Sequence, residues 1–531
     1  MHSAFIQYIF LILIILALVM IANKLRLAYP IVLVLGGLAL SFTSQFSHIT
    51  IHPELVFFIF LPPLLYEAAW QVSWKEFWRW RRLIAGFAFP IVIITACVIA
   101  FASYALIPGF TLALGFLLGG IVSPPDAISA TTIMRRVNVP KSLVSIIEGE
   151  SLLNDASSLI VFRFALAAII TGQFDFQEAA LSFVVVIVMG IVIGLLIGLV
   201  FYAVHRWLPT TPSIEIVLTL VTPYCMYYVA ETFHFSGVLA VVSGGLFLSS
   251  KRQTLLSFRS RIEGVNVWTN LVFVLNGLVF LLIGLQLRSI TQQLGDISLG
   301  TAIGYGLIIS LVLIVSRLAC TLGASIFSTF MSRFITVADA HPGWRNPLIT
   351  GWSGMRGVVS LAAALSIPLV VNVGQPFPFR NLILFITFIV ILVTLVFQGL
   401  TLPWVIRTIK PEDKYSTMPE PQQELIIQKK IAEASLQFLT QKYGRERAHN
   451  EHLSNLFAKL QSDLRSLEGE SSEANENSLA EYETVYLELL ERQRRLLNEM
   501  NRSNDFDEDL IRKYLSLIDF EEVEIRERRV S

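Results

Sequence analysis

The chain has 531 residues, of which 54% are hydrophobic and 15% charged, and its mean hydropathy is +0.65. This composition is far too apolar for a soluble domain and indicates a polytopic membrane protein. The net charge is zero, but the charges are unevenly distributed: residues 1–410 carry 23 Lys and Arg against 14 Asp and Glu, and residues 411–531 carry 17 Lys and Arg against 26 Asp and Glu. We therefore expect a membrane domain over 1–410 and an acidic, hydrophilic tail over 411–531.

Thirteen apolar segments are candidates for crossing a bilayer, which takes roughly 20 residues of α-helix, and the second and ninth are shorter than this. They are residues 3–22, 29–45, 53–72, 83–107, 111–134, 142–170, 180–204, 213–233, 236–250, 267–287, 300–330, 347–372 and 381–407. With the N-terminus outside, the cytoplasmic connections and the flank after the last segment carry nineteen Lys and Arg, and the outside connections carry two. This bias predicts an all-α protein of the cell (inner) membrane with a cytoplasmic tail.

Three of these segments contain helix breakers. Residues 53–72 include LPPLLYEA, with Glu67 a turn after two prolines; residues 111–134 include SPPDAISA; and residues 347–372 include GWSGMRG, with Arg356. Unwound backbone survives at membrane depth only beside protein or a water-filled cavity. Broken helices at matching positions of two inverted repeats often line the ion sites of transporters. The breaks in helices 5 and 12 therefore predict two inverted six-helix repeats.

Residues 148–163, EGESLLNDASSLIVFR, concentrate ionisable groups inside an apolar segment. A charge at the bilayer centre costs from about 3 to more than 10 kcal/mol, so such groups indicate a function. Ser151 and Asp155 are four residues apart and share one face of a helix, while Glu150 and Asn154 share the neighbouring face. One face can offer a carboxylate and a hydroxyl to a cation, and the other can hold a structural partner.

Buried charges in a membrane usually pair with one another. Glu150 can pair with Arg317 or with Arg356, which leaves Asp155 without a fixed cationic partner. A desolvated carboxylate of this kind can be neutralised by a proton or by a cation such as Na⁺. Further oxygen ligands would come from Ser151 and from backbone carbonyls that the break near Ser129 frees. One acid that holds either ion in turn would exchange the two ions.

Plainer roles are open for each of these residues. Asp155 can be paired with Arg163 or Arg317, and Ser151 can bond the backbone of its own helix. Glu67 can be a capped structural acid, and Asp126 can simply cap the second half of the broken helix.

Four motifs, FFIFLPPLLYEA, SPPDAISA, ESLLND and GMRG, occur in an order that resembles the cation/proton antiporter family of bacterial NhaP proteins and animal sodium/proton exchangers. The resemblance covers residues 1–410, and the bacterial long form with a charged cytoplasmic tail is the most similar. It implies a homodimer in the lipid bilayer, an NhaA/NhaP-like fold and elevator-like alternating access that exchanges H⁺ for Na⁺, with K⁺ or Li⁺ as alternatives. An Asn-Asp pair, here Asn154 and Asp155, is associated with electroneutral one-for-one exchange.

The resemblance also implies individual ligands. Asp155 matches the aspartate that binds the cation and the proton, with Asn154 before it, and Ser151 and Glu67 stand where the family supplies further cation ligands. The usual Asp-Pro of the fifth helix is here Pro-Pro-Asp-Ala, which leaves Asp126 and Ser129 as candidate ligands.

The same resemblance implies two structural charges. Glu150 matches the glutamate that pairs with an arginine of the eleventh helix, best matched by Arg317. Arg356 matches the arginine of the broken twelfth helix.

Other functions are open from the residues alone. A passive cation channel or an ion-sensing membrane protein would need no titratable ligand at the centre of its cycle. Gly351 and Ser353 belong to a GxSG motif like that of intramembrane serine proteases, but that chemistry needs a histidine on a facing helix, and none of the eight histidines lies at such depth. No Walker A or dinucleotide-binding motif is present. We therefore expect a secondary transporter, not an enzyme, with no cofactor and no nucleic-acid partner.

The tail has the helical spacing of apolar residues over 423–443 and 479–500, with a polar linker over 468–478 between them. We expect a small helical module that binds a regulatory ligand or its dimer mate. A solvated appendage without a specific role is the alternative.

Overall fold

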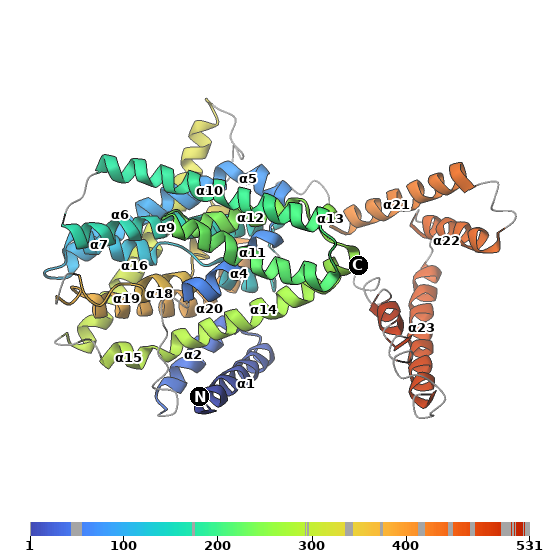
Figure 1. The fold of residues 1–531 in the computed structure, drawn as a ribbon, viewed down its shortest axis with the longest axis horizontal. Helices are drawn as coiled ribbons and strands as arrows, with labels where there is room; N and C mark the ends of the chain where they lie inside the picture. Colours follow the sequence, from blue (N-terminus) through green and yellow to red (C-terminus); the bar gives the residue numbers. More distant parts are fainter. Residues whose placement is uncertain are drawn as a thin grey trace. The chain divides into compact units, whose positions relative to one another are not determined.

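Figure 1 shows the structure, a computed structural model of the full chain. It describes residues 2–43, 56–137, 139–172, 176–292, 294, 297–334, 343–371, 375–411, 420–443, 450–467, 473–500, 511, 514–515, 517–523 and 525. In this part of the chain the regular structure is helical, apart from one bridge between Val370 and Pro376. The chain forms two compact units, Met1–Asp413 and Lys414–Ser531.

The first unit is a bundle of apolar helices. In chain order they are α1 (His2–Lys24), α2 (Tyr29–Ser41), η1 (Val56–Phe60), α4 (Leu61–Gln71), α5 (Trp74–Gly86), η2 (Phe87–Ile91), α6 (Val92–Leu106), α7 (Leu112–Val122), α8 (Ala127–Met134), α9 (Lys141–Thr171), α10 (Phe176–Trp207), α11 (Pro212–Thr232), α12 (Gly237–Ser250), α13 (Arg252–Leu255), α14 (Phe258–Leu285), α15 (Leu287–Gln292), α16 (Leu299–Met331), α17 (Arg345–Trp352), α18 (Val358–Leu365), α19 (Arg380–Val393), η3 (Thr394–Gln398) and α20 (Gly399–Ile409).

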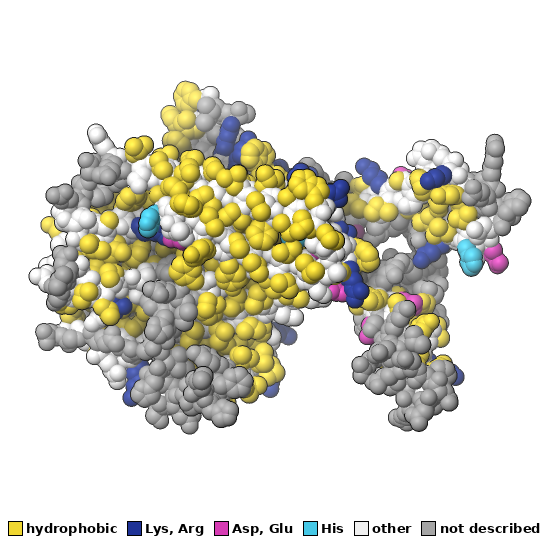
Figure 2. All heavy atoms as spheres, viewed as in Figure 1, with side chains coloured by type: hydrophobic (Ala, Val, Ile, Leu, Met, Phe, Trp, Pro, Cys, Tyr) yellow, Lys and Arg dark blue, Asp and Glu magenta, His cyan; other side chains and the backbone are white. Residues whose placement is uncertain are grey.

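Eight helical stretches of the described residues are long and apolar enough to cross a membrane. They are Trp74–Leu106, Leu112–Met134, Lys141–Thr171, Ala180–Trp207, Pro212–Thr232, Phe258–Gln292, Leu299–Met331 and Arg380–Ile409. Shorter apolar helices cover Ile9–Lys24, Tyr29–Ser41 and Gly237–Ser250. Apolar side chains spread over the visible face of this unit, as expected for a surface in contact with lipid (Figure 2). These helices make the chain a multi-pass membrane protein. The count of thirteen crossings and the two inverted repeats stay predictions, because several of the expected segments form short or broken helices.

Two of the predicted interruptions are present at the prolines and glycines that predicted them. Residues 123–126 separate α7 from α8, and residues 353–357 separate α17 from α18. The backbone N–H of Asp126 donates to the carbonyl of Met355 at 2.7 Å, so the two breaks meet. A Cβ added to Gly357 would lie 2.7 Å from a carboxylate oxygen of Asp126, which explains why this contact needs glycine.

The third irregular segment differs from the other two. Pro62 and Pro63 occupy the first turn of α4, where a missing N–H leaves no hydrogen bond unmade. The helix then runs without interruption to Gln71, and the irregular turn is the π-helix η1 in front of it. Glu67 is therefore held by a regular helix.

Helix α9 lies between two hydrophobic cores. Leu143 and Phe162 belong to the larger core, together with residues of α2, α7, α14, α16 and α19. Leu152 and Ala156, from the middle of α9, belong to the smaller core with residues of α4, α11 and α12. Asp155 is thus held at the boundary between two separately packed groups of helices.

The second unit contains α21 (Glu420–Tyr443), α22 (Glu451–Leu467) and α23 (Glu473–Met500). Both helices expected from apolar spacing are present. The linker expected over 468–478 is wrong in its second half, because α23 begins at Glu473, and residues 468–472 lie outside the described residues. Arg494 of α23 lies 2.6 Å from Asp519 and 2.5 Å from Glu522, so ion pairs join α23 to the segment near the C-terminus.

Candidate functional site

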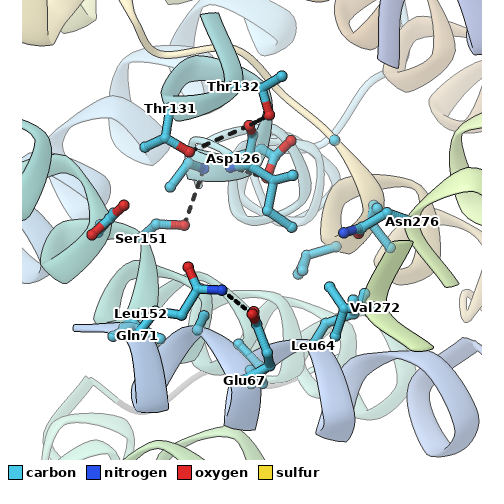
Figure 3. Close-up of a pocket in the computed structure, with 18 of the residues that line it drawn as sticks. Leu64, Glu67, Gln71, Asp126, Thr131, Thr132, Ser151, Leu152, Val272 and Asn276 are labelled. Atoms are coloured by element: carbon cyan, nitrogen blue, oxygen red, sulfur yellow. Dashed lines mark hydrogen bonds between the residues drawn. The ribbon is translucent and has the colours of Figure 1, made fainter. Parts of the chain in front are cut away.

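A cavity of about 460 Å³ lies in the first unit, beside the break between α7 and α8. Its polar lining residues are Tyr29, Glu67, Gln71, Asp126, Thr131, Thr132, Arg135, Arg136, Glu148, Ser151, Asp155, Thr269, Asn276 and Ser360. In Figure 3, Asp126 and Ser151 lie across the cavity from Glu67. The cavity therefore brings together four carboxylates that the sequence spreads over 89 positions, from residue 67 to residue 155.

Asp155 lines this cavity and is only 7% exposed. Among the described residues its carboxylate makes no hydrogen bond and no ion pair. The arginines that could lock it bind other acids: Arg163 lies 2.6 Å from Glu231, and Arg317 lies 2.8 Å from Glu150. The alternative of a locked, purely structural Asp155 is therefore wrong.

Ser151 and Asn154 hold the break of the fifth segment against α9. The Ser151 hydroxyl accepts from the N–H of Ala127 at 3.2 Å and donates to the Pro125 carbonyl at 3.4 Å. The Asn154 amide donates to the same carbonyl at 3.4 Å, and its own oxygen has no partner among the described residues. Ser151 therefore bonds the unwound backbone rather than its own helix, so the plainer role given to it is wrong.

Asp126 caps the second half of the broken helix. One carboxylate oxygen accepts from the N–H of Ile128 at 3.1 Å, and the other accepts from the Ser129 hydroxyl at 2.7 Å. The capping role is thus confirmed, and Asp126 also lines the cavity. Ser129 is 1% exposed, lies inside α8 and is not among the lining residues.

The free carbonyls expected near Ser129 belong instead to the residues before α8. Two of these carbonyls are already engaged: Val122 accepts from the Arg356 guanidinium at 2.6 Å, and Pro125 accepts from Ser151 and Asn154. Fewer backbone ligands are therefore available to a cation than the break alone suggests.

Acids and bases share the rim of the cavity. Glu67 accepts a hydrogen bond from Gln71, one turn further along α4. Arg135 lies 3.6 Å from Glu148 and donates to Gln71 at 3.3 Å. Glu67 is thus tied to a polar neighbour but not to a cation, and remains able to contribute an oxygen to a ligand in the cavity.

Glu150 and Arg317 form a buried ion pair behind the cavity wall. Nη2 of Arg317 lies 2.8 and 3.0 Å from the two carboxylate oxygens of Glu150, and the side chains are 4% and 1% exposed. Arg356 is fully buried and bonds backbone instead: its guanidinium donates to the carbonyls of Val122 and Gly354. Glu150 therefore pairs with Arg317 and not with Arg356, which closes the choice that the sequence left open.

Residues 10–408 match the sequence model of a family described as "Sodium/hydrogen exchanger, transmembrane". The chain belongs to the sodium/hydrogen exchanger family. These are monovalent cation/proton antiporters, so the chain is a transporter by family.

Curated relatives of this exchanger include a "Sodium, potassium, lithium and rubidium/H(+) antiporter" of Bacillus pumilus, 34% identical over 409 residues, which are 74% of this chain and 60% of the relative. The exchanger thus spans less than two thirds of that relative. An uncharacterized Na⁺/H⁺ exchanger of Mycobacterium tuberculosis is 30% identical over 95% of this chain and 93% of its own length. The low-affinity Na⁺/H⁺ antiporter NhaS1 of Synechocystis is 32% identical over 72% and 69%.

The fold is that of a solved sodium proton antiporter. MjNhaP1 of Methanocaldococcus jannaschii superposes with a TM-score of 0.59, with 19% sequence identity, over 77% of this exchanger and 100% of the solved chain.

Two further observations concern the serine of the GxSG motif and possible metal ligands. The Ser353 hydroxyl is buried and donates to the carbonyl of Thr350 at 2.9 Å, so nothing in this geometry favours a protease. Within the described ranges no three His, Cys, Asp or Glu residues cluster closely enough to hold a resident metal ion.

Sequence reasoning missed several lining residues of the exchanger. Gln71 and Arg135 join Glu148 on the polar rim of the cavity, and Asn276 and Ser360 line the cavity from α14 and α18. Asn276 and Ser360 do carry a signal, because each is a polar residue inside a strongly apolar run, FVLNGLVF and VVSLAAAL. Their position beside the site follows only from the packing of α14 and α18.

Proposed function

We propose that this exchanger is a secondary active antiporter that trades one proton for one monovalent cation, chiefly Na⁺, with Asp155 binding either ion. The observation that carries this function is the unpaired Asp155 carboxylate beside a cavity in a membrane-spanning helix. Such a carboxylate is costly when charged and empty, so it must hold a proton or a cation. A carrier that crosses only when this acid is neutralised couples the two fluxes.

The cation would be held by oxygens, as hard cations prefer. Asp155 supplies the charge, Ser151 supplies a hydroxyl on the same helix face, and Glu67 contributes from the facing helix, through water. Asp126 lines the cavity and caps α8, and the Ser129 hydroxyl supports its carboxylate from inside α8. Asn154 supplies the neutral member of the Asn-Asp pair, so a single charge is exchanged and the stoichiometry is electroneutral.

Alternating access would come from movement at the boundary between the two hydrophobic cores, where Asp155 sits. Arg135 and Arg136 line the cavity, and basic residues collect on the cytoplasmic side of membrane proteins, which supports a cavity open to the cytoplasm. The Glu150–Arg317 pair and Arg356 hold the breaks in place during this movement. A homodimer would provide a fixed frame in the bilayer, with the second unit as a cytoplasmic regulatory module that binds a ligand or its dimer mate.

The names of two relatives bear on the cation range. The name of the Synechocystis relative gives Na⁺, and that of the Bacillus relative gives sodium, potassium, lithium and rubidium. The family and the oxygen-lined cavity support Na⁺ first, with Li⁺ and K⁺ as further cations.

The test uses everted membrane vesicles with a respiration-driven pH gradient followed by a fluorescent dye. Addition of Na⁺ to vesicles with the wild-type chain should dissipate the gradient, and vesicles with Asp155→Asn should not respond. A passive channel would instead conduct Na⁺ without moving protons, so the dye would report no recovery in the wild type. Dissipation by Asp155→Asn at the wild-type rate would show that another group couples the ions.

A further inference from the structure

Asn276 lines the cavity with a buried side-chain amide. It belongs to α14, is 3% exposed, and its oxygen has no hydrogen bond among the described residues. Figure 3 shows its polar end directed into the cavity. A buried polar group without a partner costs about 1–3 kcal/mol, so a partner from the cavity contents is expected.

Ser360 repeats this situation on another helix. It belongs to α18, directly after the second break, is 1% exposed, and its hydroxyl has no partner among the described residues. Like Asn276 it lines the cavity that Asp155 lines. Two helices therefore each bring a residue with an unsatisfied neutral oxygen to the wall of the same cavity.

The charge of the cavity decides which ligand fits these oxygens. Glu67, Asp126, Glu148 and Asp155 all line it, and one of its two arginines, Arg135, is paired with Glu148. An anion would be repelled there, whereas a cation would be attracted. The amide of Asn276 presents its oxygen to a cation by a half-turn about its last side-chain bond, and the hydroxyl of Ser360 needs only a change of rotamer.

We propose that Asn276 and Ser360 form a neutral-oxygen subsite of the cavity, which holds a partly hydrated monovalent cation beside the acidic site and sets the preference among cations. The subsite rests on the proposed function in that its ligand is the transported cation. Two protein oxygens leave most of the coordination to water, and a cavity of about 460 Å³ has room for several waters of about 30 Å³ each.

The uncharged ligands give this subsite a definite selectivity. Neutral oxygens attract a cation less strongly than a carboxylate does, so they favour ions that shed water easily. K⁺ loses its hydration more cheaply than Na⁺, and Na⁺ more cheaply than Li⁺. Loss of the subsite should therefore harm K⁺ transport most.

The chain offers matched controls. Gln398 is a buried amide, 1% exposed, whose oxygen also lacks a partner among the described residues, and Thr387 is a buried hydroxyl in the same state. Neither lines the cavity. Gln398→Met and Thr387→Val therefore reproduce the change in polarity and packing of Asn276→Leu and Ser360→Ala away from the cations.

The experiment measures KM and kcat for K⁺, Na⁺ and Li⁺ in proteoliposomes. Asn276→Leu and Ser360→Ala should raise KM for K⁺ at least fivefold and for Li⁺ less than twofold, with kcat and the pH profile unchanged. Asn276→Asp, which replaces the neutral oxygen by a carboxylate, should shift the preference from K⁺ towards Na⁺ and Li⁺. Equal changes for all cations, or the same changes in the two controls, would overturn the subsite. Ser360→Ala removes a single atom and serves where Asn276→Leu does not fold.

A second measurement does not depend on exchange. In the Asp155→Asn protein, thermal stabilisation in detergent by K⁺ relative to choline should persist and should vanish when Asn276→Leu is added. Its absence in Asp155→Asn alone refutes the subsite. Wild-type protein that exchanges no cation while this stabilisation persists refutes the proposed antiport but keeps the subsite.

Discussion

Removal of one charge from the Glu150–Arg317 pair should destabilise the membrane unit strongly. Both side chains are almost fully buried, at 1% and 4% exposure, and their oxygen and nitrogen atoms are 2.8 Å apart. Replacement of either residue strands the other charge in a medium that cannot solvate it, which costs about 3–5 kcal/mol. We therefore expect Glu150→Gln and Arg317→Gln each to lose several kcal/mol of unfolding free energy.

The same magnitude can be expressed as a melting temperature. Unfolding entropy of about 2.1 cal/mol/K per residue gives roughly 0.9 kcal/mol/K for a unit of about 400 residues, so 3–5 kcal/mol lowers the midpoint by about 3–6 °C. The assay is thermal unfolding of the detergent-solubilised protein, followed by intrinsic fluorescence or by loss of the monodisperse peak after heating.

The control variants distinguish the effect of a buried ion pair on stability from that of an exposed one. Arg259 and Glu263 of α14 lie 2.7 Å apart, but their side chains are 68% and 44% exposed. Arg259→Gln should leave the midpoint within about 1 °C, because exposed pairs contribute little. The double replacement Glu150→Leu with Arg317→Met removes both charges and should recover much of the loss. Single replacements that melt with the wild type would refute the assignment of a stabilising buried pair.

Three further outcomes follow from the proposed cycle. If H⁺ and Na⁺ compete for Asp155, a tenfold rise in proton concentration in the acidic range should raise the apparent KM for Na⁺ about tenfold and leave the maximal rate unchanged. A fall in the maximal rate at constant KM would contradict this competition. Arg163 of α9 and Glu231 of α11 join two helices by a partly exposed ion pair of 2.6 Å. Arg163→Ala and Glu231→Ala should each change the ratio of the Na⁺ affinities measured for influx and for efflux by up to about fivefold. An unchanged ratio in both variants would exclude a role for this pair in alternating access. A chain ending before Lys414 lacks the second compact unit and should still exchange ions in everted vesicles with a shifted pH response, whereas loss of exchange by correctly inserted protein would make that unit part of the transport machinery.

The sequence predicted best what depends on local chemistry. Two adjacent prolines, Pro124 and Pro125, and the three glycines of GWSGMRG disfavour a helix in the middle of a segment, so both breaks were predictable. Asp126 after two prolines is a helix cap for the same reason. Pro62 and Pro63 show the limit of this rule, because prolines in the first turn of a helix do not break it, and the irregular turn is the π-helix in front of them.

Contacts that depend on the packing of distant helices could not be predicted from the sequence. The distance from Glu150 to Arg317 spans 167 positions, and only the arrangement of α9 and α16 decides between Arg317 and Arg356. The carbonyls freed at the break were expected to face a cation, yet Arg356 and Asn154 come from elsewhere to bond them. Asn276 stands out as a polar residue in an apolar run, but only the packing of α14 shows that it lines the cavity.

Proton release on Na⁺ binding tests the central role of Asp155 most directly. Purified protein in weakly buffered detergent, held at a pH where the acid is protonated, is mixed with NaCl or with choline chloride, and a pH indicator counts the protons released. Wild-type protein should release one proton for each Na⁺ bound, and Asp155→Asn should release none. Proton release by Asp155→Asn equal to that of the wild type would contradict the account.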